Sequence, residues 1–197
     1  MRICEGLPSL RALWSVVLAA ITAGNLRDDF RIVLFAVMSN HIHMIIEANN
    51  GDAMSKGMTG LNTRLARAIN KAAGSTDQVF ATRYDAKELK NPTMVRRAIV
   101  YVLHNIKKHA PQLAPLLDPC SSARWFPYFK EFVPASILPS PVRAPRTWLA
   151  RVGWLKAGGP ISIHEQPGVP PVSWTPEKAQ RWRQEGCSDA TSPQKVR

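Results

Sequence analysis

The pattern of hydrophobic and polar residues predicts an alternation of strands and helices over the first 110 positions. Runs rich in β-branched and aromatic residues predict strands, and apolar residues spaced three and four apart predict helices. Strands are expected at residues 2–4, 30–38, 41–48 and 78–87, and helices at residues 10–23, 53–73 and 91–109. Ser39-Asn40 fits a tight turn that joins two of these strands into a hairpin.

The order β-α-β-β-α-β of the first six elements is typical of the ferredoxin-like, or split βαβ, fold. We therefore expect an α+β sandwich in which an antiparallel sheet carries two helices on one face. The helix at residues 91–109 is an addition to this frame. Because RNA-recognition modules use the same frame, the fold alone does not decide the function.

The composition changes after residue 110. Fourteen of the 16 prolines and five of the six tryptophans lie beyond this point, where long regular elements are therefore not expected. We predict a domain at residues 1–110, an irregular Pro/Trp-rich appendage at residues 111–162 and a disordered tail at residues 163–197. No run is apolar enough to span a bilayer and the first residues lack a secretory pattern, so we expect a cytoplasmic protein with no membrane partner.

The positive charge is concentrated in one part of the chain. The formal net charge is +12, and residues 54–109 account for +8 of it. Such a concentration indicates a nucleic-acid partner, although a solvated helix face is the simpler alternative. The residues chosen for phosphate contacts are Arg64, Arg67, Lys71, Arg83, Lys87 and Arg97.

Two histidines stand two positions apart on a predicted strand. Because successive side chains alternate between the faces of a sheet, His41 and His43 project from the same face, which we expect to be open to solvent. Two imidazoles placed in this way can converge on one metal ion. The alternative is a pair of ordinary surface histidines.

The last predicted helix carries a tyrosine on the side opposite its apolar stripe. Tyr101 shares that side with Arg97 and with Asn105, which lies one turn further on. A tyrosine in this setting is a candidate nucleophile, and a surface tyrosine is the alternative. A phenol can attack a phosphodiester when a metal held by His41 and His43 polarises the phosphate, and Asn105 could supply a third ligand. The products are a 5′-phosphotyrosine and a free 3′-OH.

These residues resemble bacterial single-tyrosine transposases of the HUH (His-hydrophobic-His) superfamily, the insertion-sequence-200-like transposases, and most of all their REP-associated branch. The resemblance is carried by VMSNHIHMIIEA (37–48), GMTGLNTRLARAINKAAG (57–74), QVFATRYDAKEL (78–89) and VRRAIVYVLHNIKKHA (95–110). It implies a metal site at His41, His43 and Asn105 that takes Mg²⁺ or Mn²⁺, and Tyr101 as nucleophile. It also implies single-stranded DNA, often a hairpin, as partner, and a monomer or homodimer.

Two departures from the family pattern keep an alternative open. The proline that commonly follows the asparagine after the tyrosine is missing, since Ile106 follows Asn105. The first strand is also shorter than in relatives, which should loosen the sheet. The alternative is a catalytically inactive or domesticated protein that still binds single-stranded nucleic acid. An RNA-binding module is a further rival, but the strands lack the aromatic platform on which such modules stack bases.

Overall fold

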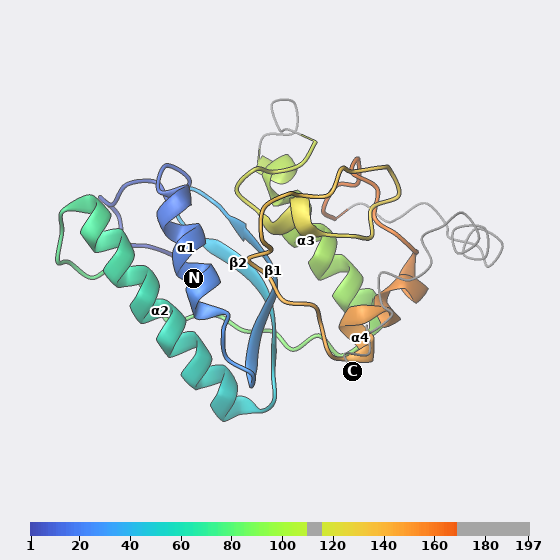
Figure 1. The fold of residues 1–197 in the computed structure, drawn as a ribbon, viewed down its shortest axis with the longest axis horizontal. Coiled ribbons are helices and arrows are strands. Elements are labelled where there is room, and N and C mark those ends of the chain that lie inside the picture. The colour runs from blue at the N-terminus through green and yellow to red at the C-terminus, as the bar shows by residue number, and fades with distance from the viewer. Residues whose placement is uncertain (110–115, 169–197) are drawn as a thin grey trace.

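The computed structural model describes residues 1–109 and 116–168, and shows three layers (Figure 1). A two-stranded antiparallel sheet lies in the middle, with two helices on one face and a third helix with the appendage on the other. The helices and strands are α1 (Trp14–Gly24), β1 (Phe30–Val37), β2 (Ile42–Ala48), α2 (Gly51–Ala73), α3 (Pro92–His109) and α4 (Trp148–Arg151), with 3-10 turns η1 (Ser122–Trp125) and η2 (Gly153–Ala157).

The sheet has the strand order of the ferredoxin-like fold, but two of its four strand positions form only isolated bridges. β1 and β2 pair in antiparallel fashion from Phe30↔Ala48 to Val37↔Ile42. On the other edge of β2, Arg2 forms an isolated bridge with His41, and Ile3 forms one with Phe80. The spatial order is therefore the segment at residue 80, the N-terminal segment, β2 and β1. This arrangement confirms the expected α+β class and the split βαβ frame.

The predicted strand at residues 78–87 is wrong beyond its first residues. Only the bridge at Phe80 forms, and residues 83–90 have no regular structure. The physical reason is the shortness of the neighbouring strand. The backbone of Arg2 and Cys4 bonds to Ala81 and Val79, and the following residues have no strand beside them with which to continue the ladder.

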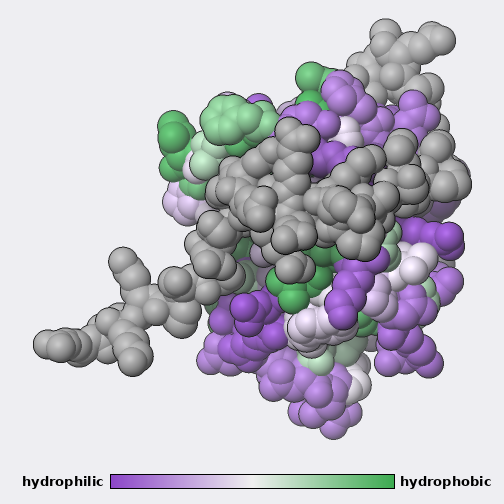
Figure 2. Space-filling view, turned by 90° about the vertical axis from the view of Figure 1, so that its right-hand side faces the viewer, coloured by the Kyte–Doolittle hydropathy of each residue, from purple (hydrophilic) through white to green (hydrophobic). Residues whose placement is uncertain are grey.

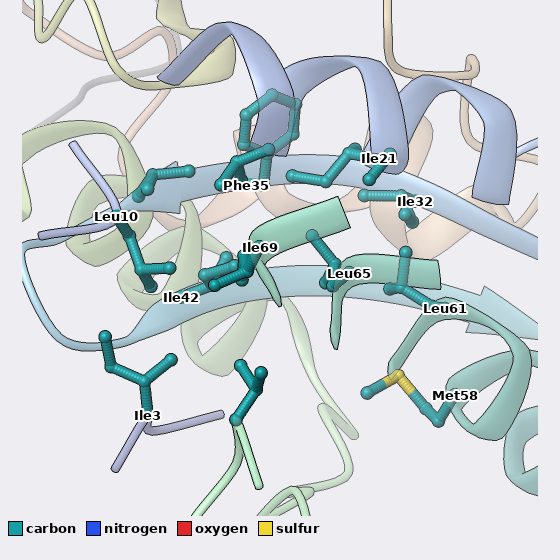
Figure 3. Packing of buried hydrophobic residues seen from close by; sticks show 14 of the residues in the cluster. Ile3, Leu10, Ile21, Ile32, Phe35, Ile42, Met58, Leu61, Leu65 and Ile69 are labelled. Atoms are coloured by element: carbon teal, nitrogen blue, oxygen red, sulfur yellow. The ribbon is translucent and has the colours of Figure 1, made fainter. Parts of the chain in front are cut away.

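A first hydrophobic cluster fills the space between the sheet and the helices α1 and α2. Figure 3 shows Leu61, Leu65 and Ile69 of α2 packed over Ile32 and Ile42 of the strands. The short N-terminal segment contributes to the same cluster through Ile3, which is buried.

A second hydrophobic cluster covers the opposite face of the sheet. Val95 and Ile99 of α3 pack with Leu34 and Ile45, and the appendage adds aromatic side chains such as Trp154. As a result, all eight residues of β1 are buried. The expectation of an open face is therefore wrong for most of the sheet, because α3 and the appendage cover it, and only at the histidine end are the side chains half-buried.

Helices α2 and α3 begin and end within two residues of the predicted bounds, whereas α1 does not begin where expected. Asn50 and Asn91 cap α2 and α3 by accepting the N–H groups of Ala53 and Met94, and Gly74 ends α2 at φ 65°. Helix α1 begins at Trp14 rather than at residue 10. Residues 10–13 form turns instead, in which Leu13 N donates to Ser9 O and Trp14 N to Arg11 O, and the N–H of Leu10 donates to Ser39 O of the hairpin turn.

Two partly buried ion pairs join the appendage to the domain. Asp118 accepts two hydrogen bonds from Arg11, each of 2.9 Å, and Glu165 accepts two from Arg96 of α3, of 2.8 and 2.9 Å. The contacts with α3 thus continue to Glu165, past the expected end of the appendage at residue 162. The predicted tail from residue 169 onward lies outside the described residues. Figure 2 faces this side of the molecule and shows hydrophilic residues along its lower part and right side, with hydrophobic residues at the upper left and in the middle.

Candidate active site

The two histidines lie at the start of β2, directly after the hairpin turn. The N–H of Met38 donates to His41 O at 2.8 Å, which closes a two-residue loop of Ser39 and Asn40 as predicted. The Nε2 atoms of His41 and His43 are 2.9 Å apart, and their rings meet edge to face with centroids 4.6 Å apart. The two Nε2 atoms therefore already face each other in the folded chain.

Asn40 fixes the orientation of His41. Its Oδ1 lies 2.7 Å from Nδ1 of His41. A carboxamide oxygen can only accept, so this contact requires a hydrogen on Nδ1, and in that tautomer Nε2 turns its lone pair toward His43. Sequence reasoning assigned Asn40 only to the turn. The adjacency of an acceptor side chain to the histidine was the available signal for this second role.

Tyr101 meets the histidine pair from α3. Its hydroxyl oxygen lies 3.4 Å from Nε2 of His43, and the two rings meet edge to face with centroids 4.9 Å apart. The docking of Val95 and Ile99 against the sheet brings the phenol to this position. Tyr101 is distant in the sequence from His41 and His43, yet it forms one cluster with them on the face of the sheet that α3 covers.

Asn105 lies one turn beyond Tyr101, next to a distortion in the helix. The backbone leaves helical geometry at His104, with φ −115° and ψ 15°. Both residues are fully buried, and within the described part of the chain their side-chain nitrogen and oxygen atoms have no hydrogen-bond partner. An unpaired buried polar group costs about 1–3 kcal/mol, so each one needs a reason, such as a catalytic role or a bound water or ion.

His104 was not predicted from the sequence, where its position beside Asn105 was the only signal. Burial, and next the positive charge of Lys107, lowers the pKa of the His104 ring to about 3. The ring is therefore neutral at neutral pH. It stacks on Phe129 of the appendage, with centroids 6.1 Å apart, so it also links the tyrosine helix to that segment.

The spacing of the histidine pair fits two ligands of one divalent cation. Imidazole nitrogens bind such an ion at about 2.1 Å, so two of them at a right angle lie about 3 Å apart, close to the 2.9 Å between the Nε2 atoms. No three His, Cys, Asp or Glu side chains converge on one point in residues 1–109 and 116–168. The carboxamide of Asn105, which is buried and unpaired one turn after Tyr101, has an oxygen of the kind that divalent cations also bind.

The predicted phosphate-binding residues are all exposed, but they occupy different parts of the surface. Arg64, Arg67 and Lys71 lie on the outer side of α2, in the layer that the sheet separates from α3 (Figure 1). Arg83 and Lys87 lie in the irregular segment after Phe80. Only Arg97 shares a helix with Tyr101, one turn before it. Of the six residues, the structure thus places only Arg97 near Tyr101.

Fold and cluster together define a class of protein: an α+β domain that presents a histidine pair to a tyrosine from an added helix. Residues 15–104 match the family model described as "Transposase IS200 like". This part of the chain is a transposase domain of the IS200-like family. No curated protein and no solved structure matched the chain. Among the helices of the described residues, none has the length and apolar character needed to cross a membrane.

Proposed function

We propose that this transposase domain cleaves and rejoins single-stranded DNA through a covalent bond to Tyr101. The observation that carries the proposal is the contact of the Tyr101 hydroxyl with His43, whose Nε2 in turn lies 2.9 Å from that of His41. The phenolic oxygen forms a bond to phosphorus while the bond from phosphorus to the 3′ oxygen breaks. The phenol gives up its proton and the 3′ oxygen gains one. One phosphodiester replaces another, so no external energy source is needed.

His41, His43 and Asn105 would hold Mg²⁺ or Mn²⁺ in this reaction. When bound, such a cation polarises the phosphate and stabilises the departing oxygen. The residues of the chain prepare the site. Asn40 keeps the lone pair of His41 Nε2 available, and two ligating Nε2 atoms require the proton of His43 to sit on Nδ1. The buried docking of α3 holds the phenol beside the ligands.

A single chain supplies both the tyrosine and the histidines. Tyr101 reaches His43 within the same molecule, which supports a monomer that completes the first cleavage alone. Arg97, one turn before Tyr101, is proposed to contact the phosphate backbone near the cleaved bond. Arg64, Arg67, Lys71, Arg83 and Lys87 are proposed to contact strand segments further away, including the arms of a hairpin.

The test is the formation of a covalent adduct. The full chain is incubated with Mn²⁺ and single-stranded hairpin DNA labelled on the 3′ side of the cleavage site, and the product is separated under denaturing conditions. We expect an adduct that is lost with EDTA, in Tyr101→Phe and in the double variant His41→Ala/His43→Ala. Tyr84→Phe is the matched control and should keep the adduct. Adduct formation by Tyr101→Phe would falsify the assignment of the nucleophile.

A catalytically silent single-strand binder is the second candidate. The observation that favours it is the reduced sheet, in which the N-terminal segment and residues 79–81 contribute isolated bridges only. In that case the protein binds hairpin DNA tightly, with an affinity that falls with salt, and gives no adduct with any divalent cation. The same assay therefore separates the two candidates.

A further inference from the structure

A cavity of ≈ 340 Å³ lies between the sheet, α3 and the appendage. Leu34 of β1, Ile45 of β2 and Ile99 of α3 form its inner wall. The other walls come from the appendage, in residues 125–128, 140–145 and 150–154, which lie beyond the residues 15–104 that match the family model. The family match therefore assigns no role to most of this cavity.

The cavity adjoins the active-site cluster on the same face of the sheet. Ile45 follows His43 by two positions on β2, so both side chains project from one face and their Cα atoms are about 7 Å apart. On α3, Ile99 precedes Tyr101 by two positions. The same two elements thus carry the active-site cluster and the inner wall of the cavity, and a ligand at Tyr101 that extends along them reaches the cavity.

The lining of the cavity suits a flat aromatic ring with a polar edge. The rings of Trp125, Phe126, Tyr128 and Trp154 contribute to its walls. The hydroxyl of Tyr128 makes no hydrogen bond to any residue that the structure describes, so it is available to the edge of such a ring. The volume is at the lower end of the about 300–1,000 Å³ of small-ligand sites, which fits one base and excludes a duplex or a folded segment.

The mouth of the cavity carries positive charge. Arg143 and Arg151 line the cavity, whose lining includes no acidic side chain. The Arg151 side chain is exposed, and its guanidinium forms no ion pair within the described part of the chain. Arg31 lies behind the rim, where it donates to Ala144 O at 2.8 Å. Its other terminal nitrogen, Nη2, is buried and has no hydrogen-bond partner among the described residues.

The carboxylates near this mouth do not cancel its charge. Asp28 pairs with Arg143 at 3.2 Å, and Glu47 accepts hydrogen bonds from Arg146 N and from Thr147. Both carboxylates also face Arg31, as Arg143 and Arg146 do. Together with Arg151, four guanidiniums stand against two carboxylates. This excess of positive charge favours an anionic ligand such as a DNA phosphate.

Helix α4 adds a second aromatic surface beside the mouth. Trp148 remains 55% exposed, and its ring is held from behind by Gly153, where a Cβ would lie 2.6 Å from the ring. Lys156 Nζ lies 5.1 Å from the centre of the same ring. Exposed aromatic rings next to cations are typical of surfaces that bind single strands, because bases stack on the rings while cations contact the phosphates.

We propose that the cavity binds one unpaired base of the DNA strand that the active site cleaves. The base enters between the aromatic walls, its edge faces the hydroxyl of Tyr128, and the phosphate attached to its nucleotide contacts Arg151. A base within a duplex is paired and stacked, so it cannot enter. The appendage thereby selects strands that have an unpaired base at one position close to the cleaved bond. This inference rests on the proposed function, since that function places the strand at Tyr101.

The test measures binding without cleavage. Hairpin DNA with randomised single-stranded flanks is selected for binding to the full chain in EDTA, and each flanking nucleotide of a selected hairpin is then replaced in turn by an abasic unit. We expect one position at which loss of the base weakens binding about tenfold or more. Ala144→Trp, which fills the rim, should bind the intact hairpin as weakly as the parent chain binds that abasic hairpin, with no further loss on base removal.

Two other variants make the result specific. Ala135→Trp is the matched control, since Ala135 is exposed and lies outside the lining, and it should keep the base-sensitive position. Tyr128→Phe preserves the ring and should reduce the difference in affinity among the four bases at that position. It also tests the same site if melting curves show that Ala144→Trp does not fold.

Three outcomes overturn the proposal: no base-sensitive position in either flank, a position that Ala144→Trp leaves equally sensitive, or equal preference among bases in Tyr128→Phe and the parent chain. A mononucleotide that competes for the cavity when no strand position is base-sensitive assigns the site to a free nucleotide instead. Failure here is distinct from failure of the proposed function. A chain that forms the adduct but has no base-sensitive position refutes only the role of the cavity, and base-sensitive binding without any adduct refutes only the chemistry.

Discussion

The hydroxyl of Tyr101 lies 3.4 Å from Nε2 of His43, although the two residues are 58 positions apart in the chain. This contact depends on a helix that packs on the second face of the sheet. The nucleophile and the ligands of the proposed reaction thus sit on two elements, β2 and α3, whose relative position is set by apolar packing. Changes in that packing and in the hydrogen bonds around the histidines should therefore alter the chemistry.

Replacing Asn40 should weaken metal binding without removing a ligand. In Asn40→Ala the acceptor for His41 Nδ1–H is lost, so the ring no longer keeps its lone pair turned to His43. We expect Mn²⁺ affinity, measured by calorimetry, to fall about 10–100-fold. Asn40→Asp keeps an acceptor oxygen at the same place and should retain most of the affinity. Equal losses in both variants would argue against the orienting role.

Replacing Asn105 by leucine should affect the stability of the protein and its metal binding in opposite directions. The carboxamide is buried and unpaired, so the nearly isosteric apolar side chain removes a cost of about 1–3 kcal/mol. Asn105→Leu should melt at or above the temperature of the parent chain, yet bind Mn²⁺ more weakly and form less adduct. If metal affinity is unchanged in a well-folded Asn105→Leu protein, the third ligand lies elsewhere.

Acid should destabilise the protein through His104. Its ring has a pKa of about 3 in the folded chain and about 6.5 when unfolded. The unfolded state then binds more protons below pH 6.5, so the free energy of unfolding falls by about 2 kcal/mol between pH 7 and pH 5 from this residue. His104→Phe, which preserves the stacking on Phe129, should remove this part of the dependence in denaturant titrations at both pH values. If the free energy of unfolding of His104→Phe depends on pH as steeply as that of the parent chain, the assignment to His104 is contradicted.

Two adjacent arginines of α3 should have opposite roles. Arg96 is buried and paired with Glu165, so Arg96→Ala leaves a carboxylate unpaired and should cost about 3–5 kcal/mol of stability in denaturant unfolding. Arg97 is exposed, and Arg97→Ala should change stability by no more than about 0.5 kcal/mol. Arg97→Ala should instead weaken binding to single-stranded DNA and lower the steepness of its salt dependence by about one phosphate contact. If Arg96→Ala is as stable as the parent chain, the structural role assigned to Arg96 is wrong.

Two glycines of α2 should respond oppositely to alanine. A Cβ at Gly57 would lie 2.2 Å from the ring of Phe30, so Gly57→Ala must push α2 away from β1 and should cost about 1–3 kcal/mol. A Cβ at Gly60 meets nothing within 4 Å, and Gly60→Ala should stabilise the helix by up to about 1 kcal/mol. Thermal melts of the two variants check the prediction. A neutral Gly57→Ala would show that α2 and β1 pack less tightly.

The sequence determined most of the local structure. The spacing of apolar residues predicted the helices α2 and α3 with little error, because helix periodicity is a local property. The two-residue turn likewise fixed the hairpin that carries His41 and His43. The residue types and their spacing were enough to single out Tyr101 and Asn105 on the last helix.

Only the tertiary structure decided where these elements meet. The face of the sheet that carries the histidines was expected to be open, but α3 and the appendage cover most of it. A sheet buries whichever face finds apolar partners, and no local sequence pattern shows which helix supplies them. The strand expected at residues 78–87 failed for a related reason. A strand needs a neighbour to pair with, and the N-terminal segment offers one only as far as Phe80. The unpaired state of Asn105 and the tautomer of His41 also depend on the groups that surround them in space, which the sequence does not list.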